Sequence, residues 1–279
     1  MIPNLSVDTL LMSTPNEFFD THCHFDFSTF AEDREKIWQG CTANGVSGLL
    51  IPGVSPEQWQ SAAQLSEKHE GIFFAAGIHP WWIEKNNAGD LNEQYLETIR
   101  HDLYATLSAP KCVAVGECGL DAMIQTPLAM QQKILDVHLQ VASDLALPLI
   151  IHCRKAHNEL LSQLKNYTLI RGGVIHAFSG SIELANQYWS LGFYLGVGGT
   201  ITYARANKTR AAVKQLPIEA MVLETDAPDM PLSGQQGQRN SPENIPIIAQ
   251  ALATIRNESI HYIAQRTTQN ARTLFGLSL

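Results

Sequence analysis

Short apolar runs alternate with longer amphipathic stretches along almost the whole chain. Each run holds mainly aliphatic and β-branched residues and carries its polar residues at its end. Runs of this kind are typical of parallel strands that are buried on both faces of a sheet. We expect eight such strands, at Phe18–His24, Val46–Pro52, Ile72–His79, Cys112–Glu117, Pro148–His152, Gly173–Phe178, Phe193–Val197 and Met221–Asp226.

The stretches between and after these runs have the pattern of amphipathic helices. We expect helices at Asp33–Ala43, Pro56–His69, Leu91–Leu107, Leu128–Ala146, His157–Leu164, Ile182–Leu191, Arg205–Gln215, Pro242–Arg256 and Glu258–Phe275. Eight strands that are each followed by a helix favour an α/β fold of the (β/α)₈ TIM-barrel type, for which about 250 residues are typical. A doubly wound open sheet is the alternative, but no Gly-rich phosphate loop follows the first strand.

The chain shows no change of composition that would mark a linker between domains. We therefore expect one barrel domain over residues 18–279, preceded by a polar N-terminal extension over residues 1–17. The extension lacks the basic and apolar regions of a signal peptide. Met12 is a second candidate for the first residue of the protein.

Side chains that bind metals stand at the ends of five of the expected strands. His22 and His24 are two residues apart, so in a strand they project from the same face. The carboxyl ends of parallel barrel strands meet at one mouth, where such proteins place their chemistry. Four imidazoles and two carboxylates are expected to converge there: His22, His24, Glu117, His152, His176 and Asp226.

A divalent metal site explains this cluster better than a purely structural role. A lone histidine at a strand end is more often a hydrogen-bonded structural residue, but six buried ligand-type residues without a cation would carry a large desolvation cost. Cys23, Cys118 and Cys153 each follow a candidate ligand, and strand alternation turns them away from it. The expected ligands are then nitrogen and oxygen atoms, which suit Zn²⁺, Mn²⁺, Fe²⁺, Co²⁺ or Mg²⁺ and disfavour a thiolate zinc site.

Further polar and aromatic residues lie near the same expected mouth. His79 is a candidate to contact substrate or to cap a loop, and Arg154, two residues after His152, is a candidate to bind phosphate or to form a salt bridge at the rim. Trp81–Trp82 could stack on a base or sugar or pack as a lid. We expect Asp121 to organise a loop and Glu224 to orient a ligand.

The net charge limits the kinds of molecule that the protein can bind, and the cysteine content indicates the cellular compartment. With 19 Lys and Arg against 27 Asp and Glu, the net charge is −8, which excludes a basic nucleic-acid-binding surface over the whole molecule but not a local site. No apolar run reaches the roughly 18 residues of a membrane span, so no membrane partner is expected. The five cysteines are scattered, which favours free thiols in a reducing cytoplasm. The oligomeric state stays open.

The motifs at the strand ends resemble those of the TatD family of metal-dependent hydrolases, whose barrel is of the amidohydrolase-like type. The similarity extends from about Phe18 to the C-terminus and includes six ordered segments. These are Asp20–His24, Gly77–Pro80, Val115–Asp121, Ile151–Arg154, His176–Gly180 and Leu223–Pro228. Cys153 stands where the family often has serine, but it is expected to face away from the metals.

The resemblance implies two divalent metal ions per subunit. Carried over to this sequence, it implies that His22, His24 and Asp226 hold the first ion and that Glu117 bridges both ions. His152 and His176 would hold the second ion. A metal-activated water would attack the substrate, with Asp226 as its proton acceptor and with His79 and Arg154 near the substrate.

The implied activity is that of a phosphodiesterase or deoxyribonuclease acting on single-stranded DNA or RNA ends, or on a small phosphodiester. Two alternatives remain at this point. The same metals could hydrolyse a carboxyl ester, amide or lactone, such as the aminoacyl ester of a tRNA. A non-catalytic metal-binding protein is disfavoured by the complete set of ligands.

Overall fold

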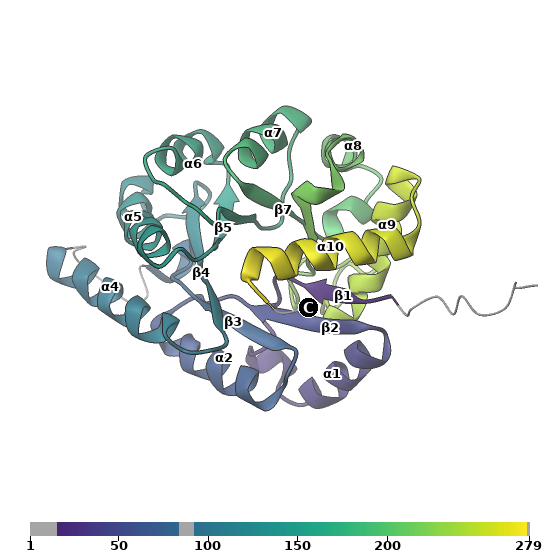
Figure 1. The fold of residues 1–279 in the computed structure, drawn as a ribbon, viewed down its shortest axis with the longest axis horizontal. Helices are drawn as coiled ribbons and strands as arrows, with labels where there is room; N and C mark the ends of the chain where they lie inside the picture. The colour runs from purple at the N-terminus through teal and green to yellow at the C-terminus, as the bar shows by residue number, and fades with distance from the viewer. Residues whose placement is uncertain (1–15, 84–91, 278–279) are drawn as a thin grey trace, which may run out of the picture.

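The chain forms a ring of eight parallel strands enclosed by helices (Figure 1). The computed structural model describes residues 16–83 and 92–277. The strands follow one another around the ring in sequence order: β1 (Phe18–Asp20), β2 (Val46–Ile51), β3 (Ile72–Ala76), β4 (Cys112–Asp121), β5 (Leu149–Arg154), β6 (Gly173–Ile175), β7 (Phe193–Val197) and β8 (Met221–Leu223). The predicted (β/α)₈ barrel is confirmed.

The helices lie close to their expected positions. Those of eight residues or more are α1 (Arg34–Ala43), α2 (Pro56–Lys68), α4 (Glu93–Leu107), α5 (Leu128–Leu145), α6 (His157–Leu164), α7 (Ile182–Ser190), α8 (Asn207–Gln215), α9 (Ile245–Arg256) and α10 (Ile260–Phe275). Leu91, the expected start of the third helix, and most of the expected N-terminal extension lie outside the described residues. The domain boundary after residue 17 therefore stays a prediction.

No helix within 16–83 or 92–277 has both the length and the apolar content needed to cross a bilayer.

Several strands end at different residues from those expected. The ladders of β1, β3, β6 and β8 stop before their polar residues, so His22, His79, His176 and Asp226 lie just after a strand rather than inside it. By contrast, β4 and β5 extend further than expected, to Asp121 and Arg154. The predicted ends were wrong at β6 and β8 because the backbone leaves the extended conformation there: Ala177 and Asp226 have φ angles of 46° and 57°.

The inward-facing residues of the strands form a small apolar core at one end of the ring. Ile150, Val174 and Val222 belong to this inner cluster, whereas their strand neighbours pack outwards against the helices. Side chains two residues further along a strand face the same way. This places His152, His176 and Glu224 inside the ring, above the apolar core.

The ring closes where β1 meets β8. The amide of Thr21 donates to the carbonyl of Leu223 over 2.9 Å, and the amide of Asp226 donates to the carbonyl of His22 over 2.8 Å. The buried Asp20 carboxylate accepts hydrogen bonds from the Thr225 hydroxyl (2.6 Å) and the Thr225 amide (2.9 Å). These bonds hold the segment after β1 beside the segment after β8.

Helix α10 covers the N-terminal end of the barrel and crosses the front of the ring in Figure 1. Its residues Ala271, Leu274 and Phe275 belong to the inner apolar cluster. Asn270, which is 7% exposed, donates from Nδ2 to the carbonyls of Ile218 and Met221, each over 2.8 Å. One amide group thus fastens α10 to the chain that enters β8.

We expect Asn270→Ala to lower the free energy of unfolding by about 2–4 kcal/mol, because two carbonyls at this buried contact lose their donor. Urea unfolding of the metal-free protein measures the effect. Gln265→Ala is the matched control, since Gln265 lies on the same helix but is exposed, and we expect a change below about 0.5 kcal/mol. Equal effects of the two substitutions would contradict the role given to Asn270.

Candidate metal centre

Glu117 reaches the interior of the ring through an irregularity in β4. Gly116 pairs with Ile150 of β5 and Cys118 pairs with Ile151, so Glu117 is an extra residue between them. Such a bulge re-aims a side chain and is frequent beside functional sites. Glu117 was expected at the end of its strand; it lies in the middle, and its carboxyl group is buried at the barrel mouth.

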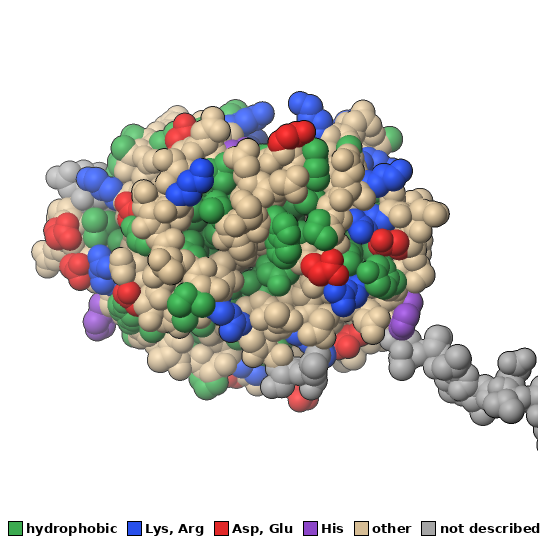
Figure 2. Space-filling model, turned by 45° about the horizontal axis from the view of Figure 1, so that its top comes forward, with side chains coloured by type: hydrophobic (Ala, Val, Ile, Leu, Met, Phe, Trp, Pro, Cys, Tyr) green, Lys and Arg blue, Asp and Glu red, His purple; other side chains and the backbone are tan. Residues whose placement is uncertain are grey.

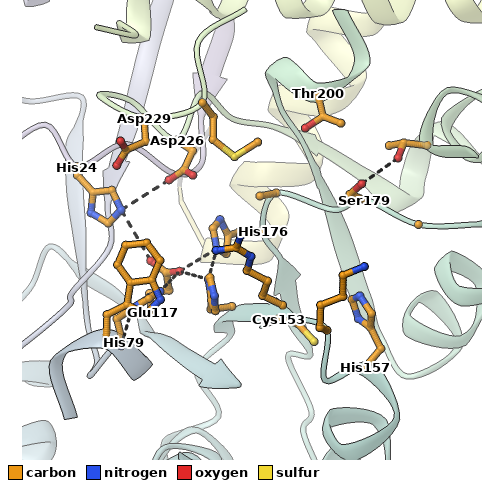
Figure 3. A pocket seen from close by; sticks show the side chains of 18 of the residues that line it. His24, His79, Glu117, Cys153, His157, His176, Ser179, Thr200, Asp226 and Asp229 are labelled. Atoms are coloured by element: carbon orange, nitrogen blue, oxygen red, sulfur yellow. Dashed lines mark hydrogen bonds and ion pairs between the residues drawn. The ribbon is translucent and has the colours of Figure 1, made fainter. Parts of the chain in front are cut away.

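The two carboxylate oxygens of Glu117 face different groups of side chains (Figure 3). Oε2 lies 3.2 Å from His22 Nε2 and 3.8 Å from His24 Nε2. These two nitrogens also lie 3.5 and 3.6 Å from Asp226 Oδ1. One oxygen of Glu117 therefore belongs to a group of four side chains that comes from β4 and from the segments after β1 and β8.

The other oxygen, Oε1, faces a second group. It lies 2.8 Å from His176 Nε2, 3.1 Å from His152 Nδ1 and 3.4 Å from His79 Nε2. The ring nitrogens of His152 and His176 are 3.0 Å apart. The structure therefore brings together all six side chains that the sequence predicted as ligands; their binding of metal stays a prediction.

Both groups suit a divalent cation. Ligand atoms that surround a metal tetrahedrally at about 2.0–2.2 Å lie about 3.3–3.6 Å from one another, close to the separations found here. Several buried nitrogens of the cluster make no hydrogen bond with any described residue, among them both ring nitrogens of His22. Among residues 16–83 and 92–277, three groups of His and Glu side chains have ligand atoms close enough to hold one ion: His22–His24–Glu117, His79–Glu117–His152 and His22–His176–Glu224.

Without a metal, protons must balance the charge of the cluster. Burial raises the pKa of Glu117, but the positive charge of surrounding imidazoles, above all His176, outweighs burial and holds this pKa well below its usual value. Burial lowers the pKa of His176, but the nearby Glu117 carboxylate outweighs that effect and raises the pKa to about 10. A cation would take the place of that proton.

His79 differs from the other imidazoles in its hydrogen bonding. Its Nδ1 accepts a hydrogen bond from the amide of Trp81 over 3.1 Å. In a neutral imidazole the proton must then be on Nε2, which points toward Glu117. His79 is therefore set up as a hydrogen-bond donor into the site, which disfavours it as a metal ligand.

A buried histidine of helix α5, His138, holds the segment that carries His79. His138 Nδ1 lies 2.7 Å from the Ile134 carbonyl, and its Nε2 accepts a hydrogen bond from the Ile78 amide over 3.0 Å. From the other side, Trp59 donates to the Gly77 carbonyl over 2.9 Å. Sequence reasoning missed His138, because a single histidine on the apolar face of a helix gives no pattern that indicates its partner.

Two acidic residues contact the outer side of the ligand-type histidines. Asp121 Oδ2 lies 3.5 Å from His152 Nε2 and accepts a hydrogen bond from Trp81 Nε1 over 2.8 Å. Glu224 Oε1 lies 3.9 Å from His176 Nδ1 and accepts a hydrogen bond from the Ala177 amide. A carboxylate behind an imidazole favours a proton on the ring nitrogen that faces it, so that the other nitrogen is free to face the site. Glu224 is placed as expected, whereas the contact of Asp121 with His152 was not foreseen.

The cluster lies at the bottom of a cavity of about 940 Å³. Arg154, His79 and both tryptophans Trp81–Trp82 line this cavity, and the Trp81 side chain is 48% exposed. Arg154 thus shares the cavity with the cluster, as its position two residues after His152 predicted.

All five cysteines are free thiols. Cys23 and Cys118 are buried in the layer between strands and helices, as strand alternation predicted. Cys153 also packs against this layer and lies 3.9 Å from the Tyr188 hydroxyl, but it is only half-buried and touches the cavity as well. The cytoplasmic location expected from the cysteines stays a prediction.

Comparison with known proteins agrees with this geometry. The family model described as TatD related DNase matches residues 19–276. The chain belongs to the TatD family of metal-dependent hydrolases.

Two curated TatD-family relatives from Escherichia coli (strain K12) illustrate the range of names in the family. The uncharacterized metal-dependent hydrolase YjjV is 41% identical over 261 residues, which cover 93% of this chain and 98% of YjjV. The 3'-5' ssDNA/RNA exonuclease TatD is 30% identical over 268 residues, covering 93% of this chain and 99% of that protein. The crystal structure of YjjV superposes with a TM-score of 0.86 over 94% of this chain and 98% of that chain.

The burial of His138 leads to a prediction about how the stability of the protein depends on pH. Burial lowers the pKa of His138 to about 4, from 6.5 for an exposed histidine. The unfolded chain therefore binds a proton more readily than the folded chain, and the stabilisation present above pH 6.5 is lost as the pH falls toward 4. We expect this one group to steepen the loss of stability by up to about 1.4 kcal/mol per pH unit in that window.

His138→Gln tests this expectation, because glutamine can accept the hydrogen bond from the Ile78 amide but does not gain a proton in this pH range. Urea unfolding at pH 7, 6 and 5, with chelator present in both proteins, should give a shallower pH dependence for the variant. The other histidines are common to both proteins and cancel in the comparison. Parallel pH dependences would show that His138 does not titrate as described.

Proposed function

We propose that the chain is a divalent-metal-dependent phosphodiesterase that cleaves nucleotides from the ends of single-stranded DNA or RNA. The observation that carries the proposal is the position of Glu117, whose two oxygens each face a separate group of nitrogen and oxygen donors. The name of the 30%-identical TatD of Escherichia coli, an ssDNA/RNA exonuclease, supports the choice of substrate.

In this proposal the six clustered side chains hold two ions. His22, His24 and Asp226 would hold one, His152 and His176 the other, and Glu117 would bridge them. Two divalent ions at such a centre lower the pKa of a water molecule and stabilise the charge that develops on attacking and leaving oxygens.

The chain's own residues would position the substrate and move the proton. Asp226 is the more accessible of the two carboxylates in the cluster, with 15% of its side chain exposed against 2% for Glu117. It is therefore the group that can accept a proton from water in the cavity. His79 Nε2 and the Arg154 guanidinium would donate hydrogen bonds to non-bridging phosphate oxygens.

The distribution of charge on the molecular surface is consistent with a substrate that enters the cavity as a single-stranded end. On the face seen in Figure 2, basic and acidic side chains are interspersed, and the whole chain has a net charge of −8. Binding to long duplex needs many phosphate contacts with Lys and Arg. We infer that affinity is concentrated at the cavity and that duplex is bound weakly.

The bridging role of Glu117 gives the sharpest prediction for this function. Glu117→Gln keeps the size of the side chain but removes the charge that lies between the two groups of donors. We expect the purified variant to contain less than two metal ions per chain, and kcat for a short oligonucleotide to fall at least about a hundredfold. Elemental analysis and single-turnover cleavage are measured on the same sample.

Glu67→Gln is the control for this substitution, since Glu67 is an exposed residue of α2 outside the cavity. It should leave both metal content and kcat unchanged. Two bound metals and near-normal turnover in Glu117→Gln would refute the bridging role.

A substrate panel tests the function itself. The metal-loaded protein is given a 3′-labelled single-stranded oligonucleotide, the same sequence as duplex, simple carboxyl esters and lactones, and an aminoacyl-tRNA. We expect release of labelled nucleotide from the single strand, at a rate at least about tenfold above that from duplex. Hydrolysis of the carboxyl esters or of aminoacyl-tRNA without nucleotide release would favour the alternative, a carboxyl-ester hydrolase.

A further inference from the structure

The cavity extends well beyond the Glu117 cluster. Its opposite wall is built by segments that follow β5, β6 and β7, and several polar residues of this wall have no part in the proposed chemistry. We name this wall the outer lobe and define it by Lys155, His157, Ser179, Lys208 and Thr209. Figure 3 shows Ser179 and His157 across the cavity from His24, His79 and Glu117.

The charges in the cavity are divided between its two sides. The carboxylates Glu117, Asp226 and Asp229 lie together on the side of His24 (Figure 3). Lys155 and Lys208 line the outer lobe, and neither forms an ion pair with any residue in 16–83 or 92–277. Cations without a carboxylate partner, in a concave site, attract an anion.

Neutral donors complement these two lysines. The hydroxyls of Ser179 and Thr209 lie 3.3 Å apart, and Thr209 is only 4% exposed. Helices α6 and α8 both begin at the outer lobe, at His157 and Asn207, and neither start has a side-chain cap. Their first-turn amides add partial positive charge at this wall.

The size of the cavity leaves room for more than one phosphate group. At about 940 Å³ it is near the upper end of the range of about 300–1,000 Å³ for sites that hold one small ligand. A phosphate at the Glu117 cluster and a second one at the outer lobe would be parts of one extended anion.

We propose that the outer lobe binds a second, non-scissile phosphate of the substrate, so that the enzyme favours chains with at least two phosphates over a single phosphate ester. This inference rests on the proposed function, since it takes the Glu117 cluster as the place of the scissile phosphate. Lys155 and Lys208 would bind the phosphate charge, and the hydroxyls of Ser179 and Thr209 would bind its oxygens.

A binding experiment on the metal-loaded protein tests the proposal without turnover. The probes are thymidine 3′,5′-bisphosphate and thymidine 5′-monophosphate, titrated by calorimetry into wild type, Lys208→Ala and Lys155→Ala. We expect wild type to bind the bisphosphate at least about tenfold more tightly than the monophosphate. Each variant should lose at least about fivefold in affinity for the bisphosphate and less than twofold for the monophosphate.

Lys214→Ala is the matched control. Lys214 is exposed in the last turn of α8, the helix that carries Lys208 in its first turn, and it does not line the cavity. This variant should bind both probes as wild type does. A salt titration of single-stranded oligonucleotide binding adds a second readout, because removing one phosphate contact should reduce the log–log slope by about 0.7 in Lys208→Ala and Lys155→Ala but not in Lys214→Ala.

The outcomes separate this inference from the proposed function. Equal losses for both probes in Lys208→Ala, or no loss for either, would overturn the outer lobe as a second-phosphate site, whatever the nuclease activity. A Lys208-dependent preference for the bisphosphate in a protein that releases no nucleotide from single strands would uphold the site and reject the nuclease assignment.

Discussion

The closure of the barrel between β1 and β8 is the constraint on which the candidate centre depends. The buried carboxylate of Asp20 accepts two hydrogen bonds from Thr225, and the amide of Asp226 binds the carbonyl of His22. Residues about 200 positions apart in the sequence thereby become neighbours. Without this seam, the imidazoles of His22 and His24 could not lie between the Asp226 carboxylate after β8 and Oε2 of Glu117. Strand closure thus assembles the chemistry as well as the fold.

Along the barrel axis, the apolar side chains of the core and the polar side chains of the candidate metal centre occupy different levels. Ile150 and Val174 fill the apolar end, and two residues later His152 and His176 face the mouth. The same alternation of side chains along each strand therefore builds an apolar core at one end of the barrel and a polar cluster at the other. The charged groups are thereby kept away from the apolar end. Contacts from behind, such as that of Asp121 with His152, then fix the orientation of the rings.

The sequence predicted the ring of strands and the convergence of six side chains, because short continuous apolar runs with polar ends are a local signal. It did not predict the bulge that turns Glu117 inward, since a glycine at position 116 is compatible with a bulge but does not determine which residue is left unpaired between the partners of Ile150 and Ile151. It also missed His138 and Lys208. His138 contacts the segment of His79, and Lys208 lines the cavity, only because of how the helices pack in the folded chain. A single histidine or lysine in a helix does not indicate which segment will lie beside it.

The position of helix α10 determines how the protein is oriented when it is attached to a surface by its C-terminus. The helix lies across the end of the barrel opposite to the mouth, and Leu277, just beyond it, still packs against the inner apolar cluster (Figure 1). A chain tethered to a bead or a sensor chip through its last residues would therefore turn its cavity outward, toward the solution. Tethering at the loops after β5 or β7 would instead press that opening against the support.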